Sequence, residues 1–325
     1  MMSDWDFLRD KFQSWTGNVL QKRPLSSALD VVRDQTRPHS LSIAQYLSRL
    51  EDPEYGLERD RLIATLVNGT TWFMRDEEGL VALVSTLKSR AQVSRRNEVT
   101  VWSAGCSTGQ EAYTLAMLLL EAGLEPKILG SDISRESLRT AQLGEYRPQA
   151  LKKVPEPWRD RYFETADDNT VRVKRHVRQR ITFKYHNLAT MDRPPTGWAG
   201  FDALVCRNVL LYFSREDAID TLKKLARATS TILVSATEQP LSWLAHASSV
   251  AGAGSAVLLE SRIGYRTPSI PVVSKSSLAS ARAPRSSART TCSSPDGSDT
   301  ARAASCSRER DPTTGAAPSP SSRHT

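Results

Sequence analysis

Cysteine is scarce in this sequence: four residues in 325, at positions 106, 206, 292 and 306. No two of them form a C-x-x-C pair, and four scattered thiols are too few for the disulfide framework of a small secreted domain. This distribution argues against a zinc site of that kind, and we expect no bound metal. We expect Cys106 and Cys206 to be reduced thiols in the core.

Long apolar runs are also missing. No stretch approaches the roughly 20 residues that cross a bilayer, and the hydrophobic fraction of 39% is ordinary for a soluble protein. Asp4 and Asp6 stand where a secretory signal would carry basic residues. These features predict a cytoplasmic protein without membrane insertion.

Positive charge exceeds negative charge by eight, which invites a nucleic-acid interpretation. The residues from 268 onward carry eight basic and four acidic side chains, so half of the excess lies in this tail. The chain also lacks an Asn-Pro-Pro-Tyr/Phe segment, which would hold a base flipped out of a nucleic acid. We therefore expect no nucleic-acid partner.

The stretch over residues 98–120 has the pattern strand, glycine loop, helix. Val99, Val101 and Trp102 indicate a short buried strand before a turn bounded by Gly105 and Gly109, and residues 111–120 carry apolar side chains at helical spacing. In an open α/β sheet such a loop lies where nucleotide-like ligands bind. It has neither the G-x-G-x-x-G spacing nor the Gly-Lys-Ser/Thr segment of phosphate-binding loops. It therefore favours a nucleoside ligand without phosphates, such as S-adenosylmethionine.

Polar residues follow two other apolar strands. Asp132 comes after residues 128–129, roughly 25 residues beyond the glycine loop, where a Rossmann-like unit places its ribose-binding carboxylate. The alternative for Asp132 is to cap the following helix. Arg207 and Asn208 end an apolar strand, and such a pair is costly to bury unless it meets a ligand or a partner.

The chain divides by pattern into three parts. Apolar residues at helical spacing predict an all-helical N-terminal domain over residues 1–66. Residues 67–266 alternate strands and helices, which predicts a doubly wound α/β domain. Within it, residues 160–183 indicate a small basic β-subdomain, whose arginines either receive a peptide at a strand edge or are simply solvated. Residues 267–325 are dominated by Ser, Ala, Arg, Pro and Thr, which predicts a disordered tail.

These segments together resemble the CheR family of chemotaxis receptor methyltransferases, which use S-adenosylmethionine to methylate glutamate side chains of bacterial chemoreceptors. The resemblance covers roughly residues 5–266. It rests on the segments 71–76, 102–113, 131–133, 187–188 and 206–213. It implies a helical N-terminal domain followed by a doubly wound, Rossmann-like catalytic domain with a small β-subdomain insert.

The resemblance also implies residue roles. Arg75 and Tyr212 are the candidate catalytic residues, with Tyr212 near the reacting methyl group. The candidate cofactor contacts are Thr71, Arg75, Ala104, Gly105, Glu111, Asp132, Asn187, Leu188, Arg207 and Asn208. Of these, Thr71 and Arg75 would contact the methionine end or the methyl-transfer site, and Glu111 would lie by the methionyl amino group. Asp132 would hold the ribose, Asn187 and Leu188 would flank the adenine, and Arg207 and Asn208 would line the crevice. One departure is Gly69, which replaces the family's asparagine, with Asn68 one position early; another is the missing Pro-Gly-Gly before the strand at 232.

The implied reaction needs no general base, because a glutamate carboxylate is already ionised at neutral pH. An anionic acceptor calls for nearby positive charge, and we expect Arg75 and Arg207 to supply it. S-adenosylhomocysteine would be the product. The expected partner is the cytoplasmic helical region of chemoreceptors, bound by a monomer. Two alternatives stay open: a non-catalytic, cofactor-binding regulator of a chemosensory-like array, and a methyltransferase of a different protein substrate.

Overall fold

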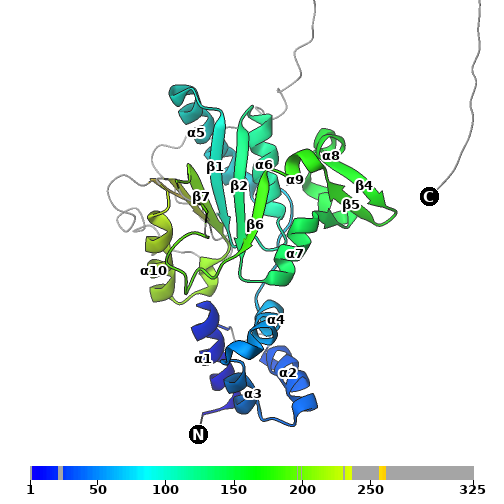
Figure 1. Cartoon of the computed structure of the whole chain (residues 1–325). Helices are drawn as coiled ribbons and strands as arrows, with labels where there is room; N and C mark the ends of the chain where they lie inside the picture. The colour runs from blue at the N-terminus through cyan, green and yellow to red at the C-terminus, as the bar shows by residue number, and fades with distance from the viewer. Residues whose placement is uncertain are drawn as a thin grey trace, which may run out of the picture. The chain divides into compact units, whose positions relative to one another are not determined.

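The computed structural model describes residues 2–20, 25–195, 197–198, 200–229, 231–235 and 256–260. Its centre is a six-stranded parallel sheet in the order β6-β2-β1-β7-β8-β9 (Figure 1). Numbered by appearance in this sheet, the order is 3-2-1-4-5-6, the doubly wound arrangement. The strands are β1 (Glu98–Ala104), β2 (Glu125–Asp132), β6 (Ile181–Tyr185), β7 (Ala203–Arg207), β8 (Thr231–Ser235) and β9 (Ala256–Glu260). The predicted α/β fold is confirmed, whereas the predicted tail lies outside the described residues.

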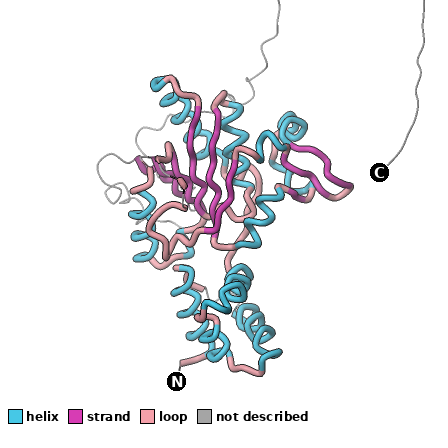
Figure 2. The backbone as a smooth tube through the Cα atoms, in the orientation of Figure 1, coloured by secondary structure: helices cyan, strands magenta, loops and turns pink. Residues whose placement is uncertain are grey.

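Helices cover both faces of this sheet (Figure 2). One face packs against α5 (Glu77–Ser94), α6 (Gln110–Glu121) and α7 (Arg135–Leu143), and the other against α10 (Arg215–Ala226). Side chains alternate along β1, so that Val101 belongs to the first core and Trp102 to the second. Burial on both faces explains the continuous apolar run from Ala203 to Cys206 in β7.

A small antiparallel sheet in the order β3-β5-β4 forms the predicted β-subdomain. Its strands are β3 (Glu145–Tyr146), β4 (Phe163–Asp167) and β5 (Thr170–Val173), joined by η3 (Pro148–Lys153), α8 (Glu156–Tyr162) and α9 (Arg175–Arg178). The strands of this sheet differ from the predicted range, residues 160–183, at both ends. β3 precedes the expected range, and the strand at 181 is β6, which pairs in parallel with β2 in the main sheet. A period of two predicts a strand but does not indicate which sheet it joins.

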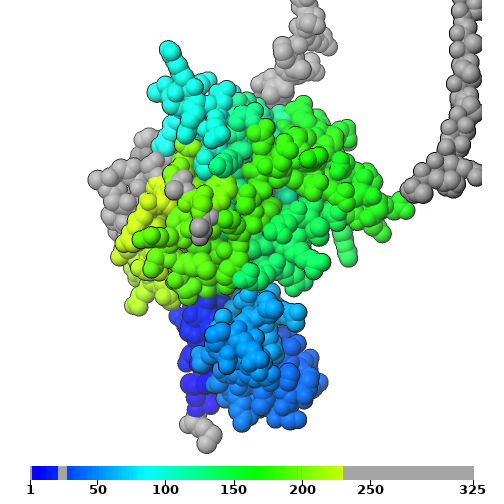
Figure 3. Space-filling model, in the orientation of Figure 1, coloured from blue at the N-terminus to red at the C-terminus, as the bar shows by residue number. Residues whose placement is uncertain are grey.

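The N-terminal segment is all-helical, as predicted. It comprises α1 (Asp4–Thr16), α2 (Leu25–Thr36), η1 (Arg37–His39), α3 (Ile43–Arg49), η2 (Pro53–Tyr55) and α4 (Gly56–Leu66). These helices share a core of their own around Leu8, Tyr46 and Leu47, and lie at one end of the sheet domain (Figure 3). In the part of the chain that the structure describes, no helix has both the length and the apolar character to span a bilayer.

Candidate functional site

A cavity opens at the carboxyl ends of β1, β2, β6 and β7, the edge at which doubly wound sheets bind ligands. Its volume is about 980 Å³ including the open mouth. Ten of the eleven candidate site residues line it: Thr71, Arg75, Gly105, Glu111, Asp132, Asn187, Leu188, Arg207, Asn208 and Tyr212. Ala104 does not; it is fully buried in the core that contains Trp102.

The turn after β1 depends on glycine. Gly105 has a φ of +79°, and a Cβ atom there would lie 2.3 Å from Cγ2 of Val209. The backbone N–H groups of Gly105 and Cys106 both donate to the carbonyl oxygen of Ser131, at 2.8 and 2.9 Å. These bonds tie the glycine loop to the end of β2, so the loop backbone forms one wall of the cavity. Cys106 is a buried free thiol, as predicted.

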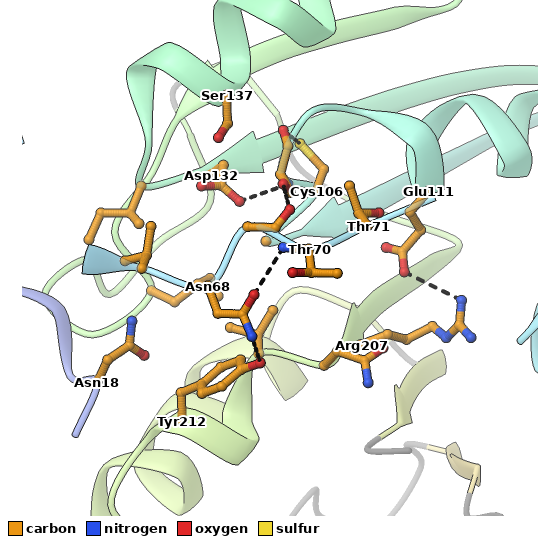
Figure 4. Close-up of a pocket in the computed structure, with 18 of the residues that line it drawn as sticks. Asn18, Asn68, Thr70, Thr71, Cys106, Glu111, Asp132, Ser137, Arg207 and Tyr212 are labelled. Atoms are coloured by element: carbon orange, nitrogen blue, oxygen red, sulfur yellow. Dashed lines mark hydrogen bonds and ion pairs between the residues drawn. The ribbon is translucent and has the colours of Figure 1, made fainter. Parts of the chain in front are cut away.

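Asp132 is the last residue of β2, and its carboxylate lies at the cavity (Figure 4). One oxygen accepts a bond from the backbone N–H of Ser107 at 2.8 Å, and the other from that of Ser134 at 2.9 Å. Burial raises the pKa of Asp132, and the backbone bonds oppose this shift. The side chain of Ser134, not that of Asp132, caps α7. The carboxylate keeps lone pairs for further donors, which suits a pair of hydroxyl groups.

Arg207 is buried and fully engaged. Its Nη2 donates to the backbone carbonyls of Arg75 and Asp76, at 2.9 and 2.8 Å, and its Nη1 lies 3.5 Å from a carboxylate oxygen of Glu111. The hydroxyl of Ser103 donates to the other Glu111 oxygen at 2.7 Å. With its side chain only 1% exposed, Arg207 holds Glu111 and the segment at 75–76 in place. The expectation that Arg207 also offers its charge to an incoming anion stays a prediction.

Arg75 differs, because its guanidinium lies against an aromatic ring at the cavity. Its central carbon is 4.4 Å from the centroid of Trp72, and its Nη1 donates to the carbonyl of Thr70 at 2.8 Å. The ammonium nitrogen of Lys153, from the β-subdomain, lies 5.1 Å from the same Trp72 centroid. Two cations therefore gather at one indole beside the cavity, and Arg75 keeps donor capacity for an anion.

A strap at residues 68–70 crosses the cavity in Figure 4. The amide of Asn68 donates to the Tyr212 hydroxyl at 2.6 Å, and its oxygen accepts from the backbone N–H of Thr70 at 3.1 Å. The Ser107 hydroxyl donates to the carbonyl of Gly69 at 2.7 Å. Asn68 thus supplies a side-chain amide to the cavity, although Gly69 stands at the position where the family has its asparagine.

The segment after β6 also lines the cavity, with His186, Asn187 and Leu188. Asn187 donates to the carbonyl of Trp15 at 2.6 Å and accepts from the backbone N–H of Ala189 at 3.0 Å, so it positions the N-terminal helix. His186 is 3% exposed, its Nδ1 has no partner among the described residues, and its ring meets Trp102 edge-to-face at 5.3 Å. Burial lowers the pKa of His186 to about 4, so its imidazole is neutral at pH 7.

Backbone strain is concentrated at this site. Six described non-glycine residues have a positive φ; Ser107 and Asn208 line the cavity, and Met74 and Asp76 flank Arg75, which also lines it. Such conformations cost about 1–3 kcal/mol each and persist where the surrounding structure enforces them. Their clustering points to a site built for function.

Sequence reasoning missed the contribution of the N-terminal segment. Thr16 and Asn18 line the cavity, Asn18 forms an antiparallel bridge with Phe213, and the Val19 N–H donates to the Tyr212 carbonyl at 2.7 Å. Gly17 was the available signal, because it ends α1 with a φ of +73°. A local helix-stop pattern does not indicate which distant segment it will contact.

The donor set fits S-adenosylmethionine. Two carboxylates, those of Glu111 and Asp132, lie at the cavity and would repel a phosphate, whereas they suit an ammonium group and ribose hydroxyls. Within the described ranges, no group of three or more His, Cys, Asp or Glu side chains could hold a metal ion. The absence of a metal stays a prediction.

Comparison with known proteins gives a family match. The profile of the CheR methyltransferase SAM-binding domain matches residues 69–239. A chemotaxis protein methyltransferase from Vibrio parahaemolyticus is 34% identical over 210 residues, which cover 60% of this chain and 74% of that protein. Another from Borreliella burgdorferi is 30% identical over 185 residues, covering 54% and 65% of the two chains.

A third relative has a different name. The "Probable biofilm formation methyltransferase WspC" of Pseudomonas putida is 31% identical over 192 residues, which cover 57% of this chain and 45% of that protein. The chain thus matches less than two thirds of the Borreliella and Pseudomonas relatives.

Proposed function

Because the chain belongs to the CheR methyltransferase family, we propose that it methylates glutamate carboxylates on bacterial chemoreceptors with S-adenosylmethionine. The observation that carries the proposal is the meeting of ten family-implied residues, from segments far apart in the sequence, at one cavity. The names of the Vibrio and Borreliella relatives support the chemoreceptor substrate.

The proposed roles follow from the contacts described above. Asp132 holds the ribose hydroxyls, because its two oxygens are fixed by backbone donors and face the cavity. Glu111 binds the methionyl ammonium, and Arg207 keeps its carboxylate oriented. S-adenosylmethionine would supply a methyl group bound to a positively charged sulfur. The ionised acceptor carboxylate would attack the methyl carbon without a general base, and S-adenosylhomocysteine would leave.

Arg75 and Tyr212 act on the acceptor side. Arg75 Nε lies 3.8 Å from a carboxylate oxygen of Asp76 and Nη1 donates to Thr70. Its remaining donors, beside Trp72, would bind the anionic acceptor carboxylate. The Tyr212 hydroxyl is fixed by Asn68, so it would meet the reacting groups in one orientation. Catalysis would come mainly from alignment of the reactants and exclusion of water.

The remaining parts of the chain also have proposed roles. Residues 1–66 would dock the acidic helical region of a receptor, with residues 67–266 as the catalytic domain and 267–325 as a disordered tail. We place the protein in the cytoplasm as a monomer.

The test is transfer of labelled methyl groups from S-adenosylmethionine to receptor-containing membranes, followed by alkaline release of volatile methanol. Base-labile label in the receptor band, abolished by Asp132→Ala, is the expected result. Labelling of another protein would support the second candidate, a methyltransferase of a different signalling substrate, which the name of the Pseudomonas putida relative favours. Cofactor binding with no labelled protein at all would favour a non-catalytic regulator.

A further inference from the structure

The N-terminal helical domain contributes a polar side chain to the cavity in addition to its own core. Asn18 follows α1 and lines the cavity together with Tyr212 and Asn187. Figure 4 shows its amide projecting from the α1 end of the chain toward Asn68 and Tyr212. Its Oδ1 is buried and has no hydrogen-bond partner among the described residues. A buried amide oxygen without a partner is costly, which points to a donor that arrives with a ligand.

The backbone around Asn18 is fixed in place. Its N–H donates to the Thr16 hydroxyl at 3.0 Å, its backbone bridges Phe213, and the next N–H donates to the Tyr212 carbonyl at 2.7 Å. Gly17 permits this close approach, because a Cβ atom there would lie 2.7 Å from Cβ of Ala189. The side chain is therefore presented to the cavity by a rigid support.

The position of Asn18 determines which part of the ligand it meets. Glu111 and Arg207 lie together at one side of the view, Asn18 lies at the other, and Asp132 lies between them (Figure 4). Asn187, which also lines the cavity, donates to the carbonyl of Trp15, three residues before Asn18. If Asp132 holds the ribose and Glu111 the ammonium, the purine base extends toward Asn18.

We propose that Asn18 recognises the adenine base of the cofactor, with Oδ1 accepting a hydrogen bond from the 6-amino group. A side-chain amide presents an acceptor and donors side by side, which matches the amino group and neighbouring ring nitrogen of adenine. This inference rests on the proposed function, since it takes the ligand to be S-adenosylmethionine. It makes the helical domain part of the cofactor site, so that ligand binding and the seating of α1 support each other.

The test compares two ligands in calorimetric titrations of the full chain: S-adenosylhomocysteine and its purine-riboside analogue, which lacks the 6-amino group. We expect the wild type to prefer the adenosyl ligand by about tenfold, the effect of one good hydrogen bond. Asn18→Ala should bind S-adenosylhomocysteine about tenfold more weakly and lose most of that preference. Asn18→Asp, which keeps an acceptor, should retain the preference.

Gln13→Ala is the matched control, because Gln13 donates to Asp217 at 3.2 Å from the same helix but does not line the cavity. It should leave the ligand preference unchanged. An undiminished preference in a folded Asn18→Ala variant would overturn the role of Asn18 while leaving the proposed function intact. Failure of the wild type to bind S-adenosylhomocysteine would overturn both.

Discussion

The amide of Asn68 donates a 2.6 Å hydrogen bond to the hydroxyl of Tyr212. These residues are 144 positions apart, and both line the cavity. The bond fixes the Tyr212 hydroxyl at the side of the cavity where the α1 end, the strap at 68–70 and the segment after β7 meet. The orientation of the Tyr212 hydroxyl, a candidate catalytic group, therefore depends on Asn68. Asn68 lies one position before the site of the family's usual asparagine.

Tyr212→Phe should lower the rate of methyl transfer by about tenfold, because it removes the hydroxyl that we propose contacts the reacting groups. The affinity for S-adenosylhomocysteine should change by less than about twofold, since the aromatic ring remains. Asn68→Ala should give a smaller loss of rate, because the hydroxyl stays but is no longer oriented. Equal losses of cofactor affinity and rate in Tyr212→Phe would contradict a role on the acceptor side.

Asp132→Ala should weaken S-adenosylhomocysteine binding by about 10- to 100-fold, the range for hydrogen bonds to a charged group. The substitution also removes the acceptor of the Ser107 and Ser134 backbone N–H groups, so unfolding by urea must be measured beside calorimetric binding. Ser137→Ala is a control at the same end of the cavity, which should leave affinity nearly unchanged. Unaltered affinity in Asp132→Ala would exclude Asp132 as the ribose ligand.

The two arginines should separate stability from activity. Arg207→Met leaves the partly buried Glu111 carboxylate without its cationic partner and should reduce the free energy of unfolding by about 3–5 kcal/mol. Arg75→Met keeps an apolar contact with Trp72 and should reduce it by less than about 1 kcal/mol, but should lower methyl transfer at least tenfold. Urea titrations and initial rates on both variants check this. A large loss of stability in Arg75→Met with little loss in Arg207→Met would contradict these assignments.

Local sequence patterns predicted much of the candidate site. The glycine loop, Asp132 and the Arg207–Asn208 pair each follow an apolar strand, and parallel strands bring their carboxyl ends to one edge. Those patterns do not predict which side chains interact with one another. Arg207 looks like a ligand contact in sequence, but its partners Glu111 and the carbonyls at 75–76 come from other elements.

The same limit explains the other differences. The strand at 181 has the alternation of a hairpin strand, yet it joins the main sheet because the edge of β2 is available there. Asn18 lies next to a helix stop with no chemical motif around it. Its place at the cavity depends on contacts with segments far along the chain, among them the antiparallel bridge to Phe213.

His186 should make stability depend on pH. Its folded-state pKa is about 4 against an ordinary value of 6.5, because burial disfavours the charged ring. As the pH falls from 6.5 to 4, the unfolded chain gains a proton at this residue before the folded protein does. The neutral ring thus contributes stability above pH 6.5 that is lost over this window, at most about 3 kcal/mol. His186→Phe should lose correspondingly less stability in urea titrations across the window, and an identical pH dependence would refute the assignment.

Gly17→Ala tests whether the close seating of α1 is required. Gly17 has a φ of +73°, and a Cβ atom there would lie 2.7 Å from Cβ of Ala189 and 2.9 Å from Cε2 of Phe213. Left-handed backbone costs a side-chain-bearing residue about 1–2 kcal/mol, and overpacking adds about 1–3 kcal/mol. The variant should therefore unfold at lower urea concentration and bind S-adenosylhomocysteine several-fold more weakly.

Gly123→Ala provides the matched control for this prediction. Gly123 has a φ of +79° but nothing within 4 Å of the position of a Cβ atom, so alanine there incurs the backbone cost alone. Its free energy of unfolding should fall by about 1–2 kcal/mol while its affinity for S-adenosylhomocysteine stays at the wild-type value. A difference between the two variants isolates the contact of α1 with Ala189 and Phe213. If both variants lost stability equally and kept full affinity, the junction at Gly17 would have no part in ligand binding.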